Sequence, residues 1–132
     1  MKTLYFEVIG STLVLVHGPL NPSPEDWDEF MQQMAAQKYT GILIDSSGGA
    51  PNKSQWAKIT DFWRDKLEPK VALTTSSSLV IEAMAATDLV SKSKIRAFRS
   101  HALSDAFDYL EISEPEREVL LKTRLRLRAR FF

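Results

Sequence analysis

The sequence predicts an α/β fold: one mixed β-sheet with an N-terminal β-hairpin and four helices, plus a basic C-terminal helix. Two short runs rich in β-branched and aromatic residues open the chain, and segments of helical and strand period then alternate. The 132 residues suit one compact domain. Apolar residues make up 44% of the chain, so a core of ordinary size can be buried.

The predicted hairpin consists of residues 4–9 and 12–16, separated by Gly10 and Ser11. A two-residue connection with glycine first suits a type II′ turn. Ser23 then serves as a helix N-cap, and Pro24 fits the first helical position. The first helix is predicted by apolar residues at helical spacing, which are Trp27, Phe30, Met31 and Met34.

Residues 40–45 form a short, almost unbroken apolar segment, which is typical of a buried central strand. A turn-forming loop follows at residues 46–51. Asn52 and Ser54 are competing N-caps for the second helix, which ends before Pro69. Its aromatic residues do not all share one face, so one of them is expected at the surface; its apolar residues are Trp56, Ile59, Phe62 and Trp63.

Residues 71–75 and 95–98 predict two further strands. Between them, Ser76, Ser77 and Ser78 cap a third helix, whose apolar residues are Leu79, Ile81, Met84 and Ala85. A fourth helix opens at Ser100, and its inward residues are Leu103, Ala106, Phe107 and Leu110. Strands separated by helices are expected to be parallel neighbours joined by right-handed crossovers.

The last 20 residues differ in character from residues 1–112, so the predicted organisation is a domain at 1–112 and a helical extension at 113–132. Ser113 and Glu116 have the spacing of a capping box, which favours a helix. Residues 125–130 alternate apolar and basic side chains, a pattern that also suits a strand. Five basic residues follow position 121 with no acidic one, namely Lys122, Arg124, Arg126, Arg128 and Arg130.

The preferred interpretation of this basic segment is packing onto its own domain or onto a second copy, which makes a homodimer through the C-terminal helix a possible arrangement. Binding to an anionic membrane or nucleic acid, and docking onto a partner protein, are the other two interpretations. Seventeen basic residues balance seventeen acidic ones, so no net charge favours nucleic acid as a partner.

Several classes of chemistry are poorly supported. There is no cysteine, and the two histidines, His17 and His101, lack the spacing of a zinc site, so no metal or cofactor is expected. The loop before the second helix has Ser47 and Asn52 where a phosphate-binding loop needs glycine. No membrane-spanning segment or signal peptide is recognised, so a cytoplasmic location is expected.

Three segments, in this order, are similar to the STAS family of the SpoIIAA-like, anti-sigma-factor-antagonist type. They are residues 39–45 (YTGILID), 71–89 (VALTTSSSLVIEAMAATDL) and 95–110 (IRAFRSHALSDAFDYL), and the resemblance covers residues 2–112. It implies a non-enzymatic module of bacterial signal transduction that binds another protein. In this family the partner is often a serine kinase that is also an anti-sigma factor.

In many STAS proteins a serine at the start of the helix after the central strand is phosphorylated, and the resemblance places Ser54 there. The family string Asp-Ser-Ser-Gly occurs one loop earlier, at residues 45–48, and Lys53 replaces the acidic neighbour. Ser54 is therefore either a phosphorylation site or only a helix cap. The surface predicted to bind a partner consists of Asp45, Ser46, Ser47, Gly48, Gly49, Asn52, Lys53, Ser54, Trp56 and Ser78.

Two other functions remain open. The first is binding of a small ligand, either a lipid or a nucleotide, which a buried apolar cavity of several hundred Å3 would favour. The second is an enzyme that uses Asp45 with Ser46. That enzyme would need His17 or His101 within hydrogen-bond reach of Ser46.

Overall fold

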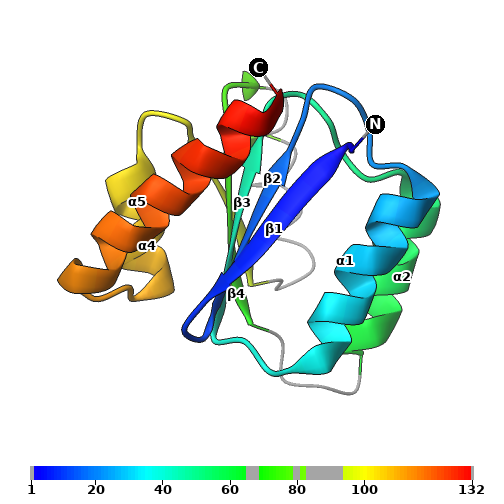
Figure 1. The fold of residues 1–132 in the computed structure, drawn as a ribbon, viewed down its shortest axis with the longest axis horizontal. Coiled ribbons are helices and arrows are strands. Elements are labelled where there is room, and N and C mark those ends of the chain that lie inside the picture. Colours follow the sequence, from blue (N-terminus) through cyan, green and yellow to red (C-terminus); the bar gives the residue numbers. More distant parts are fainter. Residues whose placement is uncertain (1, 65–68, 79–80, 83–93, 132) are drawn as a thin grey trace.

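The computed structural model describes residues 2–64, 69–78, 81–82 and 94–131. Within these ranges it contains a five-stranded mixed sheet and four α-helices, which confirms the predicted α/β class. In Figure 1 the sheet separates α1 and α2 from α4 and α5. The elements in chain order are β1 (Leu4–Ile9), β2 (Thr12–His17), α1 (Pro24–Ala36), β3 (Gly41–Ser46), α2 (Lys53–Trp63), β4 (Lys70–Thr75), β5 (Ile95–Arg99), α4 (Leu103–Leu110), α5 (Glu114–Arg128) and a 3-10 turn (Ala129–Phe131).

The strands lie in the sheet in the same order as in the chain, from β1 at one edge to β5 at the other. β1 and β2 pair in antiparallel fashion, with Ile9 opposite Thr12, so the predicted hairpin is present. Gly10 has a φ of +59°, the left-handed value that the first position of a type II′ turn requires. The remaining neighbours pair in parallel, as the alternation of strands and helices predicts.

Each face of the sheet carries its own hydrophobic cluster, because side chains alternate along a strand. In β2, Leu13 and Leu15 face α1 and α2 and pack with a cluster that includes Phe30. Val14 and Val16 face the other side, where they join a cluster from α4 and α5. The interior strand β2 is thus buried on both faces, and this explains its continuous apolar sequence.

The C-terminal segment forms the helix α5, and the strand alternative is wrong. α5 crosses the sheet on the side of α4, with Leu120 and Leu127 buried in the second cluster (Figure 1). Beyond the helix, the Phe131 ring lies 5.0 Å from the Tyr5 ring, and the Arg130 guanidinium lies 4.9 Å from the same ring. The basic segment therefore packs onto its own domain, one of the two arrangements in the preferred interpretation.

One predicted helix start is wrong, and another is right in position but lacks the predicted cap hydrogen bond. α4 begins at Leu103, not at Ser100, because residues 100–101 form a turn and Ala102 occupies the cap position without a side-chain hydrogen bond. Ser113 has the backbone geometry of an N-cap, but its hydroxyl does not bond to the helix backbone. The predicted third helix, with Leu79, Met84 and Ala85, lies largely outside the described residues.

Candidate binding site

A pocket of about 420 Å3 lies between the sheet and the helices α1 and α2. Its volume falls within the range of small-molecule sites, which is about 300–1,000 Å3. Most of its walls are aliphatic or aromatic side chains from β2, β3, β4, β5 and the two helices. They include Leu15, Phe30, Ile44, Ile59, Leu73 and all three tryptophans, Trp27, Trp56 and Trp63.

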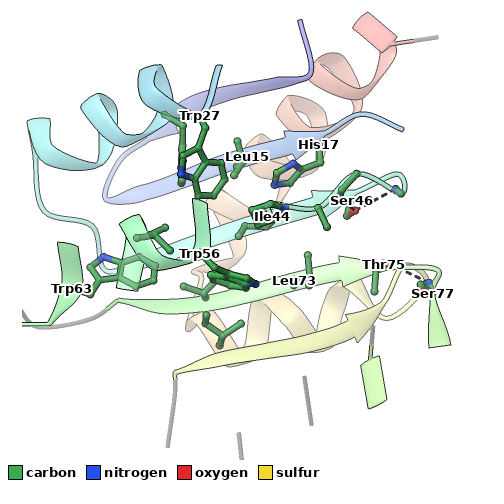
Figure 2. Close-up of a pocket in the computed structure, with 18 residues that line it drawn as sticks. Leu15, His17, Trp27, Ile44, Ser46, Trp56, Trp63, Leu73, Thr75 and Ser77 are labelled. Atoms are coloured by element: carbon green, nitrogen blue, oxygen red, sulfur yellow. Dashed lines mark hydrogen bonds between the residues drawn. The ribbon is translucent and has the colours of Figure 1, made fainter. Parts of the chain in front are cut away.

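Polar side chains gather at one end of this pocket. His17, Ser46 and Thr75 stand at or next to the carboxyl ends of β2, β3 and β4, where Figure 2 shows them on the opposite side of the pocket from Trp63. The parallel register pairs His17 with Ser46. Ligands in α/β proteins commonly bind at this edge of a sheet.

The two-residue alternation of side chains along a strand explains the structure of the polar end of the pocket. In each of three neighbouring strands a large apolar residue precedes the polar one by two positions, so both side chains face the pocket. The pairs are Leu15 with His17, Ile44 with Ser46, and Leu73 with Thr75. The alternate residues, such as Asp45 and Thr74, face α4 and α5. The sheet therefore supplies an apolar floor that becomes polar at one end.

His17 is the most unusual of the polar residues, since its side chain lines the pocket and yet only 3% of the residue is exposed. Burial lowers the pKa of its imidazole from 6.5 to about 4, so the ring is neutral at pH 7. Among the described residues, Nδ1 of His17 has no hydrogen-bond partner. The indole Nε1 of Trp27, which is also in the pocket wall, likewise has no hydrogen-bond partner among the described residues.

The loop after β3 folds tightly against the loop after β2. The Ser46 hydroxyl donates to the carbonyl of Gly49 at 2.8 Å and accepts from the amide of Gly48 at 3.3 Å. Gly49 is buried so closely that a Cβ there would lie 2.1 Å from the carbonyl oxygen of Leu20. Ser46 thus stabilises a turn at the rim of the pocket.

The geometry does not favour a catalytic serine. The proton of the Ser46 hydroxyl is directed to a backbone carbonyl, and Nδ1 of His17 forms no hydrogen bond in the described structure. His101 is exposed in the turn before α4. Among the described residues, no group of three His, Asp or Glu side chains is placed to hold a metal ion.

The start of α2 resolves the competition between Asn52 and Ser54. Asn52 is the N-cap: its Oδ1 accepts from the amide of Gln55 at 2.8 Å, and the Gln55 side chain accepts from the amide of Asn52. Ser54 occupies the second helical position and is exposed, so it is not the cap. Lys53 beside it is also exposed.

Trp56 is the aromatic residue of α2 that reaches the surface, as the sequence predicts. It is 39% exposed and also lines the pocket, so it connects the exposed start of α2 with the pocket interior (Figure 2). Gly48 is exposed at the same rim, while Gly49 is buried. The exposed part of the predicted partner surface therefore lies beside the pocket mouth.

Asp45 does not belong to this surface, contrary to the prediction. It is 1% exposed and points to the opposite face of the sheet, where the Thr74 hydroxyl donates to it at 2.9 Å. Nε of Arg124 lies 3.3 Å from its second carboxylate oxygen, and an Arg128 nitrogen lies 3.7 Å away. The carboxylate thus links β3 to α5 and is inaccessible to another molecule.

The other two serines are placed differently. Ser47 is half-buried, and its amide donates to the carbonyl of His17. Ser78 is exposed beyond β4 and lies 3.4 Å from an Arg99 nitrogen.

Several pocket residues were not predicted as part of a site from the sequence. A usable signal exists, because three strands end in the same pattern of an apolar residue, any residue and a polar residue. The pocket residues not predicted are Leu15, His17, Trp27, Leu73 and Thr75.

The fold and the pocket together define an α/β protein with a layered mixed sheet and a largely apolar pocket. No known protein family, curated protein or solved structure gives a significant match to the chain. In the part of the chain that the structure describes, the helices are all too short or too polar to cross a bilayer.

Proposed function

We propose that this protein is a non-enzymatic binding module that holds a small apolar or amphipathic molecule in the pocket. The observation that carries the proposal is the cavity of about 420 Å3 with largely aliphatic and aromatic walls. Leaving such apolar walls in contact with water is unfavourable, so a molecule that covers them gains free energy on binding. A cavity of this size is also the feature that distinguishes the ligand-binding function from the other two.

Of the two ligand classes that the sequence leaves open, the pocket favours a lipid over a nucleotide. Sites for nucleotide phosphates use lysine, arginine or a glycine-rich turn leading into a helix. The described lining of the pocket contains no lysine or arginine. Its turn before α2 contains Gly48 and Gly49, but Ser47 and Asn52 stand where a phosphate-binding loop needs glycine. Its aromatic and aliphatic walls instead match a hydrocarbon chain.

The three tryptophans of the chain provide a direct test, because all of them line the pocket. The test is a titration with N-phenyl-1-naphthylamine, an uncharged aromatic probe that accepts energy from excited tryptophan. We expect saturable quenching of tryptophan emission, with probe fluorescence rising in parallel. Absence of saturable binding would contradict the proposal.

A pair of variants locates the probe. Ile44→Phe places a larger side chain in the pocket and is expected to weaken probe binding by about fivefold, equivalent to roughly 1 kcal/mol. Leu125→Phe is the matched control, since Leu125 is 59% exposed on α5, across the sheet. Thermal unfolding of both variants checks that the fold is retained. Equal affinities of Ile44→Phe and the parent would place the probe elsewhere.

The second candidate function is the STAS-like one: regulated binding of a signalling protein at the rim of the pocket. It is supported by the exposed Lys53 and Ser54 at the start of α2 and by the partly exposed Trp56 beside them. An aromatic side chain next to a polar loop is a common hot spot of protein interfaces. A phosphate on Ser54 would lie near the free amides of the first helical turn.

Substitution of Ser54 by aspartate tests this candidate. Ser54→Asp is expected to change the proteins that co-elute with the tagged chain from native lysate, because it adds negative charge to the rim. Ser104→Asp is the matched control, since Ser104 is also exposed at the second position of a helix, α4. Identical co-eluting proteins for the parent, Ser54→Asp and Ser54→Ala would argue against a role for Ser54.

A further inference from the structure

We propose that the pocket selects an uncharged amphiphile, whose polar head hydrogen-bonds to His17 and whose hydrocarbon tail lies toward Trp63. This inference rests on the proposed ligand-binding function and specifies the ligand class. Three features of the pocket support it: its polarity changes from end to end, its buried nitrogens lack partners, and its described lining lacks charge.

The first feature is the polarity of the two ends. His17, Ser46 and Thr75 lie together at the carboxyl ends of the parallel strands, and Trp63 lies at the far side of the pocket (Figure 2). A purely apolar ligand at this end would leave Nδ1 of His17 buried without a hydrogen-bond partner among the described residues, which costs free energy. An amphiphile can place its polar head beside His17 and its apolar tail against the walls near Trp63, so both ends of the pocket are matched.

The second feature is the lack of partners for buried nitrogens. His17 is 3% exposed and Trp27 is 2% exposed, and within the described structure neither Nδ1 of His17 nor Nε1 of Trp27 has a hydrogen-bond partner. Buried polar groups in native proteins are almost always paired, so each exception calls for an explanation. Because both rings form part of the pocket wall, a polar atom of the ligand is the natural partner.

The third feature is the absence of charge in the described lining, which includes no lysine, arginine, aspartate or glutamate. The low pKa of His17 keeps the imidazole neutral near pH 7. The buried charges Asp45 and Arg124 lie across the sheet and pair with each other. The buried carboxylate of Asp26, next to Trp27 in the chain, accepts hydrogen bonds from Thr3 and pairs with Lys2. A carboxylate or phosphate head would therefore lose hydration and find no counter-ion among the described residues that line the pocket.

Two competitors with the same acyl chain test this selection: 1-monododecanoylglycerol, which is uncharged, and dodecanoate at pH 8, which is anionic. Each displaces N-phenyl-1-naphthylamine from the intact protein in a fluorescence titration. We expect the glycerol ester to compete at a concentration at least about tenfold lower, because desolvation of the carboxylate is uncompensated. Equal competition, or stronger competition by dodecanoate, overturns the inference.

Substitution of His17 tests the assigned contact. His17→Leu is expected to weaken competition by the glycerol ester about fivefold relative to the affinity of the same variant for N-phenyl-1-naphthylamine, which is measured first. His17→Gln keeps a hydrogen-bonding group and is expected to retain most of the ester affinity; His101→Leu is the control at the exposed histidine. Unchanged ester affinity in His17→Leu overturns the assignment.

These outcomes separate the inference from the function on which it rests. If the probe binds but the two competitors are equivalent, the pocket binds ligands without selecting an uncharged head. If the probe does not bind, both proposals fail. If His17→Leu does not fold, the comparison of the two competitors on the parent protein still tests whether the pocket selects an uncharged head group.

Discussion

His17 shows how one side chain can connect stability to the pocket. Its neutral state depends on burial in the folded chain, whereas in the unfolded chain it titrates near 6.5. Between pH 6.5 and about 4 the unfolded state therefore binds more protons than the folded state. Because proton binding is linked to folding, the contribution of His17 to the free energy of unfolding is fully present above pH 6.5. It is lost as the pH falls.

We expect His17→Gln to remove part of the pH dependence of stability. From the pKa values of 6.5 and about 4, the parent should lose about 2 kcal/mol between pH 7 and pH 5 through His17 alone. Urea unfolding at several pH values measures this slope. His101→Gln, at the exposed histidine, should keep the parent's slope; if His17→Gln also keeps it, burial does not hold His17 neutral.

Asp26 titrates in a separate pH range and does not obscure this measurement. Burial alone would raise the pKa of its carboxyl, but hydrogen bonds from the side chain and amide of Thr3, a hydrogen bond to Ser23 and the charge of Lys2 lower it overall. Its contribution is thus present above about pH 3.8 and is lost only as the pH falls below that value.

At the residue scale, the sequence predicted that one aromatic residue of α2 is exposed, which the structure shows to be Trp56, but it did not predict the environment of His17. An exposed aromatic follows from the angular spacing of residues on one helix, which is local information. The burial of His17 depends on α1 and α2 covering the face of β2, a relation between distant segments. Asn52, and not Ser54, is the N-cap of α2, because Asn52 and Gln55 form a reciprocal pair of hydrogen bonds.

Among the elements, α5 depends most clearly on a long-range polar contact. Arg124 reaches the buried carboxylate of Asp45 on β3, and the two are 8% and 1% exposed. The sequence predicted that α5 is a helix, because its N-terminal signals are local. It did not predict this ion pair, since the two residues are 79 positions apart.

We expect Arg124→Met to destabilise the protein by about 3 kcal/mol, because it leaves the Asp45 carboxylate buried with only partial compensation from Arg128 and Thr74. Arg126→Met is the control: Arg126 pairs with Glu7 at the surface, and its loss should cost about 1 kcal/mol or less. Urea unfolding measures both. Similar losses for the two variants would show that the buried pair has no special role.

A double variant refines this test. Combining Asp45→Asn with Arg124→Met removes both partners of the pair, so the combined loss should be smaller than the sum of the two single losses. Strict additivity would mean that Asp45 and Arg124 do not interact in solution.

At the scale of the whole molecule, the sheet is covered by helices on both faces, and the two faces differ in how completely they are packed. The face of α4 and α5 is closed by aliphatic packing and the buried ion pair, whereas the face of α1 and α2 contains the pocket. The order of elements predicted one mixed sheet packed with helices, because strand and helix periods are visible in the sequence, but it left open whether the helices cover one face or both. The position and lining of the pocket were not predictable, since a cavity depends on the space left between side chains from six elements, four strands and two helices.

The predicted boundary at residue 112 can be tested by truncation. A chain of residues 1–112 lacks the buried Leu120 and Leu127, each worth about 1.5–3 kcal/mol of burial, and also lacks the arginines around Asp45. This loss is comparable with the whole stability of many domains, about 5–15 kcal/mol. We therefore expect the truncated chain to show no cooperative thermal transition; a parent-like transition would make α5 dispensable.

The sequential order of the strands has a consequence for synthesis on the ribosome. Each strand from β2 onward pairs with the strand made just before it, so the sheet can grow at one edge while the chain is still emerging. α5 is different, because it returns to β1 and β2, the first strands to be made. Until that late segment arrives, nascent chains carry an uncovered apolar surface and an unmatched aspartate, and this is the interval in which a chaperone would matter most.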